Sequence, residues 1–185
     1  MNNKVIEHID SVIKTIWLED LKKDYANSFL LKEDSLKNAF YFHLRTRLGE
    51  NFLNQNNLRI FTEYYINREK IDLVITEIDP IKATEYYLGD SVKKVIAVVE
   101  MKYKNAFAND SIFNKDVQKV MSFIKGWGNE TKHYLAFIQE KYYRAEDIVN
   151  WLEDEQAIKA KGKVTELFAY WNTDSDDTIW SIVDH

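Results

Sequence analysis

Two runs of β-branched apolar residues stand out in the middle of the chain. Residues 95–99 are all apolar and are followed by Glu100 and Lys102, and residues 71–75 are apolar except for Asp72. Runs of this length and composition are typical of strands that are buried on both faces of a sheet. Side chains two apart on a strand point the same way, so Glu100 and Lys102 share one face. Two carboxylates and an amine can therefore meet where these strands pair.

Apolar residues recur at helical spacing in four segments, residues 5–21, 32–48, 112–125 and 144–160. The wide apolar face of the first segment indicates core packing, with an oligomer interface as the alternative. Asp34 or Ser35 can cap the second helix, and Gly49 is positioned to end it. Gly126 ends the third helix in the same way. Two helices are thus expected before the first strand, and two between later strands.

Further strands are predicted at residues 58–67, 133–138 and 165–171. The first of these forms a β-hairpin with the Asp72 strand, and an extended hairpin connection through residues 79–90 leads to the Glu100 strand. A crossover helix makes the Glu100 strand parallel to the strand after it. The acidic tail, residues 172–185, lacks the glycine and distal glutamate of a calcium-binding EF-hand loop and is interpreted as a solvated turn.

The elements follow in the order αα-βββ-α-β-α-β, which predicts an α/β fold with a mixed central β-sheet flanked by helices. The chain has 185 residues, one proline and five glycines, so it can bury a sizeable core and has little material for a linker. We expect a single domain over residues 1–185, in which an N-terminal helix, residues 1–26, packs on the core.

Composition narrows the expected compartment and partners. The absence of cysteine excludes disulfides and thiolate metal sites, and no apolar run approaches the length of a membrane span or signal core, so we expect a cytoplasmic protein with no membrane contact. The net charge of −5 argues against nonspecific coating of nucleic acid. However, residues 102–125 contain five lysines against two aspartates, directly after the Glu100 strand.

Convergent carboxylates beside an amine suit the hydrolysis of a phosphodiester. Asp72 and Glu100 would form a hard-oxygen site for Mg²⁺ or Mn²⁺, since Mg²⁺ prefers one or two carboxylates together with waters and substrate phosphate. The side chain of Lys102 could align or deprotonate the attacking water, or offset the charge that builds on phosphorus.

At these positions the chain resembles the PD-(D/E)XK nuclease superfamily. Asp72 matches the first acid, Glu100-Met101-Lys102 matches the E-x-K element, and Ile71 stands in place of the nominal proline. The resemblance implies a restriction-endonuclease-like fold and metal-dependent cleavage of DNA, or of RNA, that leaves a 5′-phosphate. It also implies that the backbone carbonyl of Met101 is a third metal ligand.

The same resemblance suggests supporting residues, each with a simpler interpretation beside it. Glu33 matches an acid that approaches the metal from the preceding helix, although it also suits any helix N-terminus. Lys119 or Gln118 would contact the substrate phosphate, although Lys119 could equally form a solvated pair with Asp116 three residues away. From its place on the hairpin, Glu63 could face the site or form an ordinary cross-strand ion pair.

Three hypotheses for the whole chain follow. The first is a Mg²⁺- or Mn²⁺-dependent nuclease in which Asp72, Glu100 and Lys102 act on nucleic acid, preferably DNA. The second is a catalytically inactive module of the same fold that binds nucleic acid or protein, and a homodimer or a protein partner fits this alternative. In the third, Glu100 and Lys102 only form an ion pair at a strand end.

Overall fold

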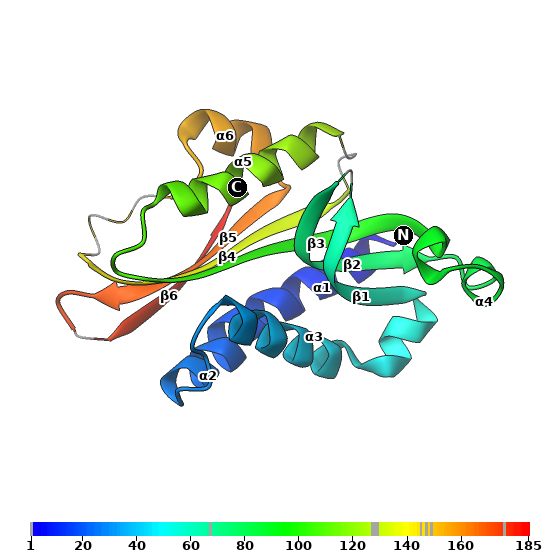
Figure 1. Ribbon diagram of the computed structural model, residues 1–185, viewed down its shortest axis with the longest axis horizontal. Coiled ribbons are helices and arrows are strands. Elements are labelled where there is room, and N and C mark those ends of the chain that lie inside the picture. The colour runs from blue at the N-terminus through cyan, green and yellow to red at the C-terminus, as the bar shows by residue number, and fades with distance from the viewer. Residues whose placement is uncertain are drawn as a thin grey trace.

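A six-stranded mixed sheet forms the centre of the computed structural model, which describes residues 2–66, 68–126, 130–144, 146, 148, 150–175 and 177–185 (Figure 1). The strands lie side by side in the order in which they occur in the chain. Their bounds are β1 (Leu58–Ile66), β2 (Glu69–Ile78), β3 (Val92–Asn105), β4 (Lys132–Tyr143), β5 (Val164–Asn172) and β6 (Thr178–Asp184).

Strand direction changes across the sheet. The pairs β1/β2, β2/β3 and β5/β6 are antiparallel, whereas β3/β4 and β4/β5 are parallel. Each parallel pair is connected through a helix, α5 (Ser111–Gly126) for the first and α6 (Asp154–Ala160) for the second. A parallel pair needs such a crossover because the chain must return to the same end of the sheet. The centre of the sheet is therefore parallel and its flanks are antiparallel.

Helices cover both faces of the sheet (Figure 1). On one face lie α1 (Asn3–Thr15), the π-helical turn η1 (Ile16–Leu21), α2 (Lys22–Ala26) and α3 (Glu33–Gln55). Their apolar side chains share a core with the odd-numbered residues of β3 from Ala97 onwards, such as Val99 and Met101. The opposite face carries α5 and α6, whose apolar side chains pack on β4 and β5 in a second core. Even-numbered residues of β3 face α5, as the packing of Val98 against Phe123 shows.

The expected α/β class and the mixed sheet flanked by helices are confirmed, but the tail was predicted wrongly. Residues expected to form a solvated turn instead contain β6, which pairs with β5. Trp180 and Ile182 of β6 pack into the first core. The acidic cluster before β6 concealed this strand because it dominates the local composition. Asp176, part of that cluster, lies outside the described residues.

Helix ends and connections also differ from the expectations. The helix expected over residues 144–160 is shorter in the structure. α6 begins only at Asp154, and the described residues between 144 and 153 are not α-helical. Gly49 does not end α3, because helix resumes beyond it after a kink at φ 71° and ψ 153°. The connection over residues 79–90 contains the short helix α4 (Lys82–Glu85) and the start of the 3₁₀ turn η2 (Leu88–Ser91). Within the described parts of the chain, no helix is both long enough and apolar enough to cross a membrane.

Candidate functional site

A side-chain hydrogen bond places Asp72 beside the Glu100 strand. The regular pairing of β2 with β3 is described from Leu73↔Val99 onwards. One residue earlier on β2, Asp72 Oδ2 accepts a hydrogen bond from the Met101 N–H at 2.8 Å. The carboxylate of Asp72 therefore lies against the backbone next to Glu100, and its charge acts on Glu100. The two acids predicted from the sequence lie close together at adjacent strands.

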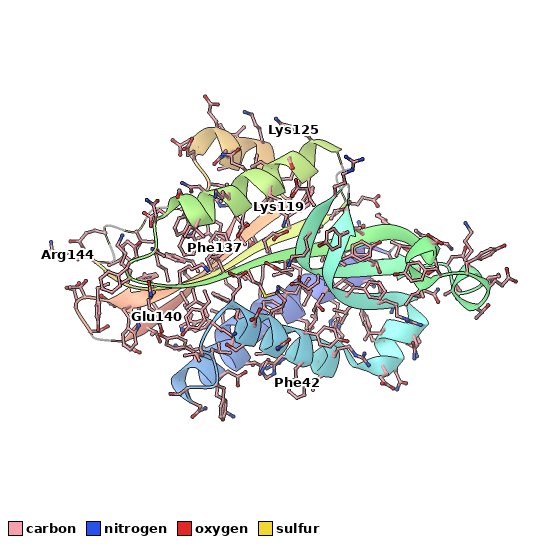
Figure 2. All side chains as sticks on the ribbon, viewed as in Figure 1. Phe42, Lys119, Lys125, Phe137, Glu140 and Arg144 are labelled. Carbon is pink, nitrogen blue, oxygen red and sulfur yellow. The ribbon has the colours of Figure 1, made fainter. Side chains whose placement is uncertain are left out.

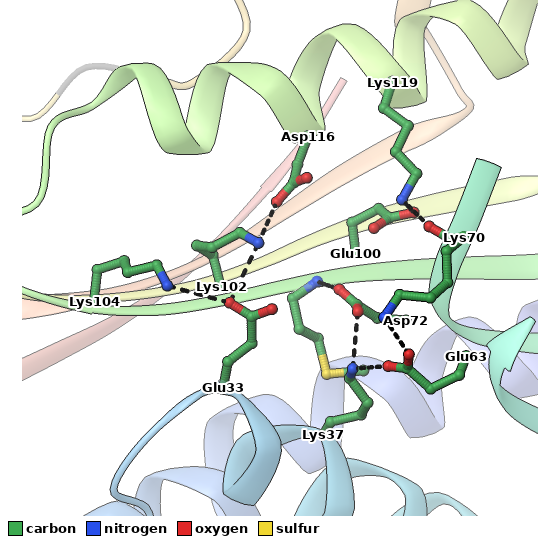
Figure 3. A network of polar contacts seen from close by, with 11 residues as sticks. Glu33, Lys37, Glu63, Lys70, Asp72, Glu100, Lys102, Lys104, Asp116 and Lys119 are labelled. Carbon is green, nitrogen blue, oxygen red and sulfur yellow. Dashed lines mark hydrogen bonds and ion pairs between the residues drawn. The ribbon is translucent and has the colours of Figure 1, made fainter.

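The hairpin is distorted at the same level. Pairing of β1 with β2 runs from Thr62↔Leu73 directly to Tyr64↔Ile71. Glu63 is not among the residues paired in this register. Its φ is 54°, a value that residues other than glycine adopt uncommonly. This irregularity turns Glu63 toward the ammonium groups of Lys37 and Lys70, with which it forms ion pairs (Figure 3). Glu63 therefore forms the cross-strand ion pair that was its simpler interpretation, with Lys70 of β2, and it also contacts Lys37 at the edge of the candidate site.

Lys37 of α3 is central to the site, and sequence analysis missed it. Its ammonium lies 3.0 Å from Asp72 Oδ1 and also contacts Glu63 (Figure 3). Burial lowers the pKa of Lys37, but Glu63 and Asp72 outweigh burial and hold the pKa well above its ordinary value. Lys37 is therefore a buried cation shared by acids from two strands. A sequence signal existed, because Glu33 and Lys37 extend the buried stripe of α3 that contains Phe40 at helical spacing.

Glu100 is almost fully buried and pairs with a helix lysine. Only 1% of its surface is exposed, and the Lys119 ammonium of α5 lies 2.7 Å from Oε1. This contact is an ion pair and not an aligned hydrogen bond. Burial raises the pKa of Glu100 to about 8, against the opposing effect of Lys119, and the charges of Asp72 and Asp116 act in the same direction as burial. Burial therefore favours the protonated form of Glu100, and the ammonium of Lys119 favours the charged form.

Lys102 lies between two other acids. Its ammonium is 3.2 Å from Glu33 Oε2 at the start of α3 and 3.1 Å from Asp116 Oδ2 on α5. Lys104 also pairs with Glu33, at 3.5 Å. Burial lowers the pKa of Lys102, but Asp116 and Glu33 outweigh burial, so the pKa stays above its ordinary value and the ammonium stays charged.

Helix α5 and strand β3 carry complementary charges where they face each other (Figure 3). β3 presents Glu100 and then Lys102, and α5 places Lys119 over the acid and Asp116 over the lysine. Asp116 and Lys119 are neighbours on the surface of α5, as predicted. Each of them, however, is bonded to β3 and largely buried, so the solvated Asp116–Lys119 pair that was the simpler alternative is wrong.

The predicted residues thus belong to three separate groups of ion-paired side chains. Asp72 pairs with Lys37, Glu100 pairs with Lys119, and Lys102 pairs with Glu33 and Asp116. Gln118 is exposed on α5. Among the described residues, no three acidic or histidine side chains come close enough together to hold a metal ion in this side-chain arrangement.

The chain was compared with protein-family models, with curated proteins and with solved structures, and none of the three comparisons found a match. The geometry of the site and the sequence pattern are therefore the only basis for a functional proposal.

Proposed function

We propose that this protein is a divalent-metal-dependent nuclease of the PD-(D/E)XK type with a restriction-endonuclease-like fold. One observation carries the proposal, the 2.8 Å hydrogen bond from the Met101 N–H to Asp72 Oδ2. This bond fixes the first acid against the E-x-K element from the neighbouring strand. If Asp72 served only as a buried counter-ion for Lys37, its carboxylate would not also need to accept a hydrogen bond from the backbone of β3.

Asp72, Glu100 and the Met101 carbonyl would hold Mg²⁺ or Mn²⁺ in this proposal. The donor set fits in kind, since Mg²⁺ favours hard oxygen ligands and uses few carboxylates when substrate phosphate and waters complete its shell. Burial raises the pKa of Glu100 to about 8, and a cation bound beside it would lower that pKa, because a nearby cation favours the charged form of a carboxylate. The bound cation would supply charge neutralisation at the phosphate and activation of a water.

In this proposal, Lys102 and Lys119 would stabilise negative charge and would not accept protons. Lys102 stays protonated because Asp116 and Glu33 hold its pKa above the ordinary value. Its ammonium can therefore orient a water or offset charge at phosphorus, but it has no lone pair with which to remove a proton. Lys119, which pairs with Glu100 in this structure, would contact the substrate phosphate. Glu33 and Asp116 would act as positioning residues for Lys102.

The test is a cleavage assay on the full chain with single-stranded and double-stranded DNA and RNA, with and without Mg²⁺ or Mn²⁺. We expect metal-dependent cleavage, which Asp72→Ala removes and which Lys102→Ala lowers by about 10²-fold or more. Asp174→Ala and Lys125→Ala are matched controls, because both residues are exposed and Lys125 lies beyond Lys119, toward the C-terminal end of α5 (Figure 2). Equal cleavage by the wild type, Asp72→Ala and Lys102→Ala would contradict the proposal.

A second candidate is a non-catalytic module of the same fold, and the ion pairs of the site favour it. Each of the two carboxylates proposed as metal ligands already has an ammonium partner, and Glu100 has almost no exposed surface. Calorimetry separates the candidates. A nuclease should bind Mn²⁺ or Mg²⁺ in a way that Asp72→Asn weakens, whereas an inactive module should show no metal binding that depends on Asp72.

A further inference from the structure

The edge strand β1 borders two grooves that meet at Phe61. The first groove lies between β1 and α3, has a volume of about 410 Å³ and contains Arg45 and Arg59 in its lining. The second lies between β1 and η2, has a volume of about 530 Å³ and contains Tyr65 and Tyr87 in its lining. We call these two grooves together the β1 trough. It follows most of the strand, because the two linings include every residue from Leu58 to Tyr65.

The first groove offers hydrogen-bond donors to an anion. Arg59 Nη1 donates to the Leu58 carbonyl at 2.7 Å, which holds the guanidinium along the strand. Arg45 makes only long contacts, at 3.4 Å to the Tyr41 hydroxyl and 3.3 Å to Glu50. A guanidinium carries five N–H donors, so both arginines keep donors for a phosphate. Tyr41 adds an aromatic ring to the same lining.

The second groove exposes two tyrosine rings, and one of them, Tyr87, rests on the backbone beside it. Tyr65 is 67% exposed and Tyr87 is 79% exposed. A Cβ atom added at Gly89 would lie 2.7 Å from the Tyr87 ring, so this ring rests directly on the glycine backbone of η2. Phe61 stacks on Tyr64 with ring centroids 5.8 Å apart. Exposed rings in fixed positions are suited to stacking against flat ligands.

The trough connects to the candidate site through one residue. Glu63 belongs to the lining of the second groove and also pairs with Lys37, which contacts Asp72. A chain lying along β1 would therefore pass close to the proposed metal ligands.

We propose that the β1 trough binds an unpaired nucleic-acid strand, with bases stacked on Tyr65 and Tyr87 and phosphates bound by Arg45 and Arg59. The inference rests on the proposed nuclease function and specifies its substrate as a single strand or an unpaired end. Bases in a duplex are already stacked on each other and cannot lie on protein rings, whereas unpaired bases can. The two guanidiniums favour a polyanion over a neutral peptide.

The test measures binding separately from cleavage. Fluorescence anisotropy of a labelled oligothymidylate is recorded with the full chain in EDTA, beside a duplex of equal length. We expect the single strand to bind more tightly than the duplex, and Tyr65→Ala and Tyr87→Ala each to weaken strand binding by roughly tenfold. The double variant Arg45→Ala/Arg59→Ala should reduce the slope of log K against log salt by about one to two.

Two further variants sharpen the result. Tyr142→Ala removes a half-exposed tyrosine from β4, three strands from β1, and should leave strand binding unchanged. Gly89→Ala displaces the Tyr87 ring without removing it and should weaken binding as Tyr87→Ala does. Because Tyr65 and Tyr87 are exposed, their loss should not unfold the protein.

The outcomes distinguish this inference from the nuclease proposal. Strand binding that Tyr65→Ala and Tyr87→Ala leave intact, or duplex binding as tight as single-strand binding, would overturn the trough even if the wild type cleaves DNA. A self-associated state that these variants dissociate would also overturn it, in favour of a second copy on β1. If the wild type cleaves nothing but the variants lose strand binding, the trough stands and the nuclease proposal fails.

Discussion

Lys37 neutralises two acids that come from different strands of the hairpin. Its side chain is 10% exposed, as is that of Asp72, and their charged atoms are 3.0 Å apart. A buried pair of this kind adds little net stability compared with apolar residues of similar volume, but removal of one partner leaves an uncompensated charge. The site therefore depends on each cation and anion being present together.

We predict that Lys37→Met destabilises the protein by about 3 kcal/mol, because Asp72 loses its buried partner. The double variant Lys37→Met/Asp72→Asn should regain part of this loss, since the remaining buried group is neutral. Urea unfolding measures both. Lys125→Met, on an exposed part of α5, is the control and should change the free energy of unfolding by less than about 0.5 kcal/mol. A double variant less stable than Lys37→Met would contradict this explanation.

His133 makes stability depend on pH. It lies at the start of β4, is 1% exposed, and has its pKa lowered to about 4 by burial and by Lys163. Between pH 6.5 and about 4 the unfolded chain binds a proton at this position that the folded protein does not bind. The stabilisation is therefore complete above pH 6.5 and is lost as the pH falls, by roughly 3 kcal/mol in total.

We expect His133→Gln to flatten the dependence of unfolding free energy on pH across this interval. Urea unfolding at several pH values measures the slope. His8→Gln is the matched control, because His8 is exposed on α1, and it should keep the slope of the wild type. Identical slopes for the wild type and His133→Gln would show that other groups cause the acid sensitivity.

Among the elements, α3 has the largest part in shaping both the site and the β1 trough. Its first turns bring Glu33 to Lys102 and Lys37 to Asp72, and residues on both sides of Gly49, among them Arg45 and Leu53, supply one wall of the trough. Gly49 joins the two sides at a φ of 71° and a ψ of 153°. Only glycine adopts this combination without strain, because a Cβ atom would crowd the backbone.

We predict that Gly49→Ala destabilises the protein by about 1–3 kcal/mol. No atom outside the local backbone and the two neighbouring residues lies within 4 Å of the place where a Cβ would stand, so the cost would come from the local backbone. Gly49→Asn tests this cause. Asparagine tolerates the left-handed helical region, but a ψ of 153° lies outside that region, so we expect asparagine to be strained as well. Thermal unfolding should show both variants destabilised, and an unchanged melting temperature for Gly49→Ala would disprove the strain.

In the molecule as a whole, the N-terminal helices pack against β6, the last strand of the chain. Trp17 of η1 contacts Trp180 of β6 with ring centroids 4.7 Å apart. Lys14 of α1 pairs with Asp184 at 2.8 Å. The N-terminal helices thus bury a strand that sequence analysis did not find, and they join the β6 flank of the sheet to α3 through one core.

Trp180→Ala should therefore cost about 3–5 kcal/mol, because a large side chain leaves the core that joins the two ends. Urea unfolding gives the value. Phe107→Ala removes a ring that is 95% exposed and serves as the control, with an expected change below about 0.5 kcal/mol. A cost as small as that of Phe107→Ala would mean that β6 contributes little to the fold.

Local pattern was sufficient for most of the elements. β2 and β3 were predicted because continuous β-branched runs have few stable alternatives to a buried strand. The proximity of Asp72 and Glu100 followed from the pairing of these strands. Gly49 was identified as a break in α3, but its φ and ψ, which decide between an end and a kink, depend on the contacts on either side of it.

The charge partners and β6 depended on long-range packing. Lys37 reaches Asp72, Lys119 reaches Glu100 and Asp116 reaches Lys102 only because helices from distant parts of the chain cover opposite faces of the sheet. The sequence places a charge on a helix or a strand, because side-chain period and propensity are local properties. Which opposite charge it meets is set by how whole elements dock, since burial requires every charge in the interface to find a partner at once.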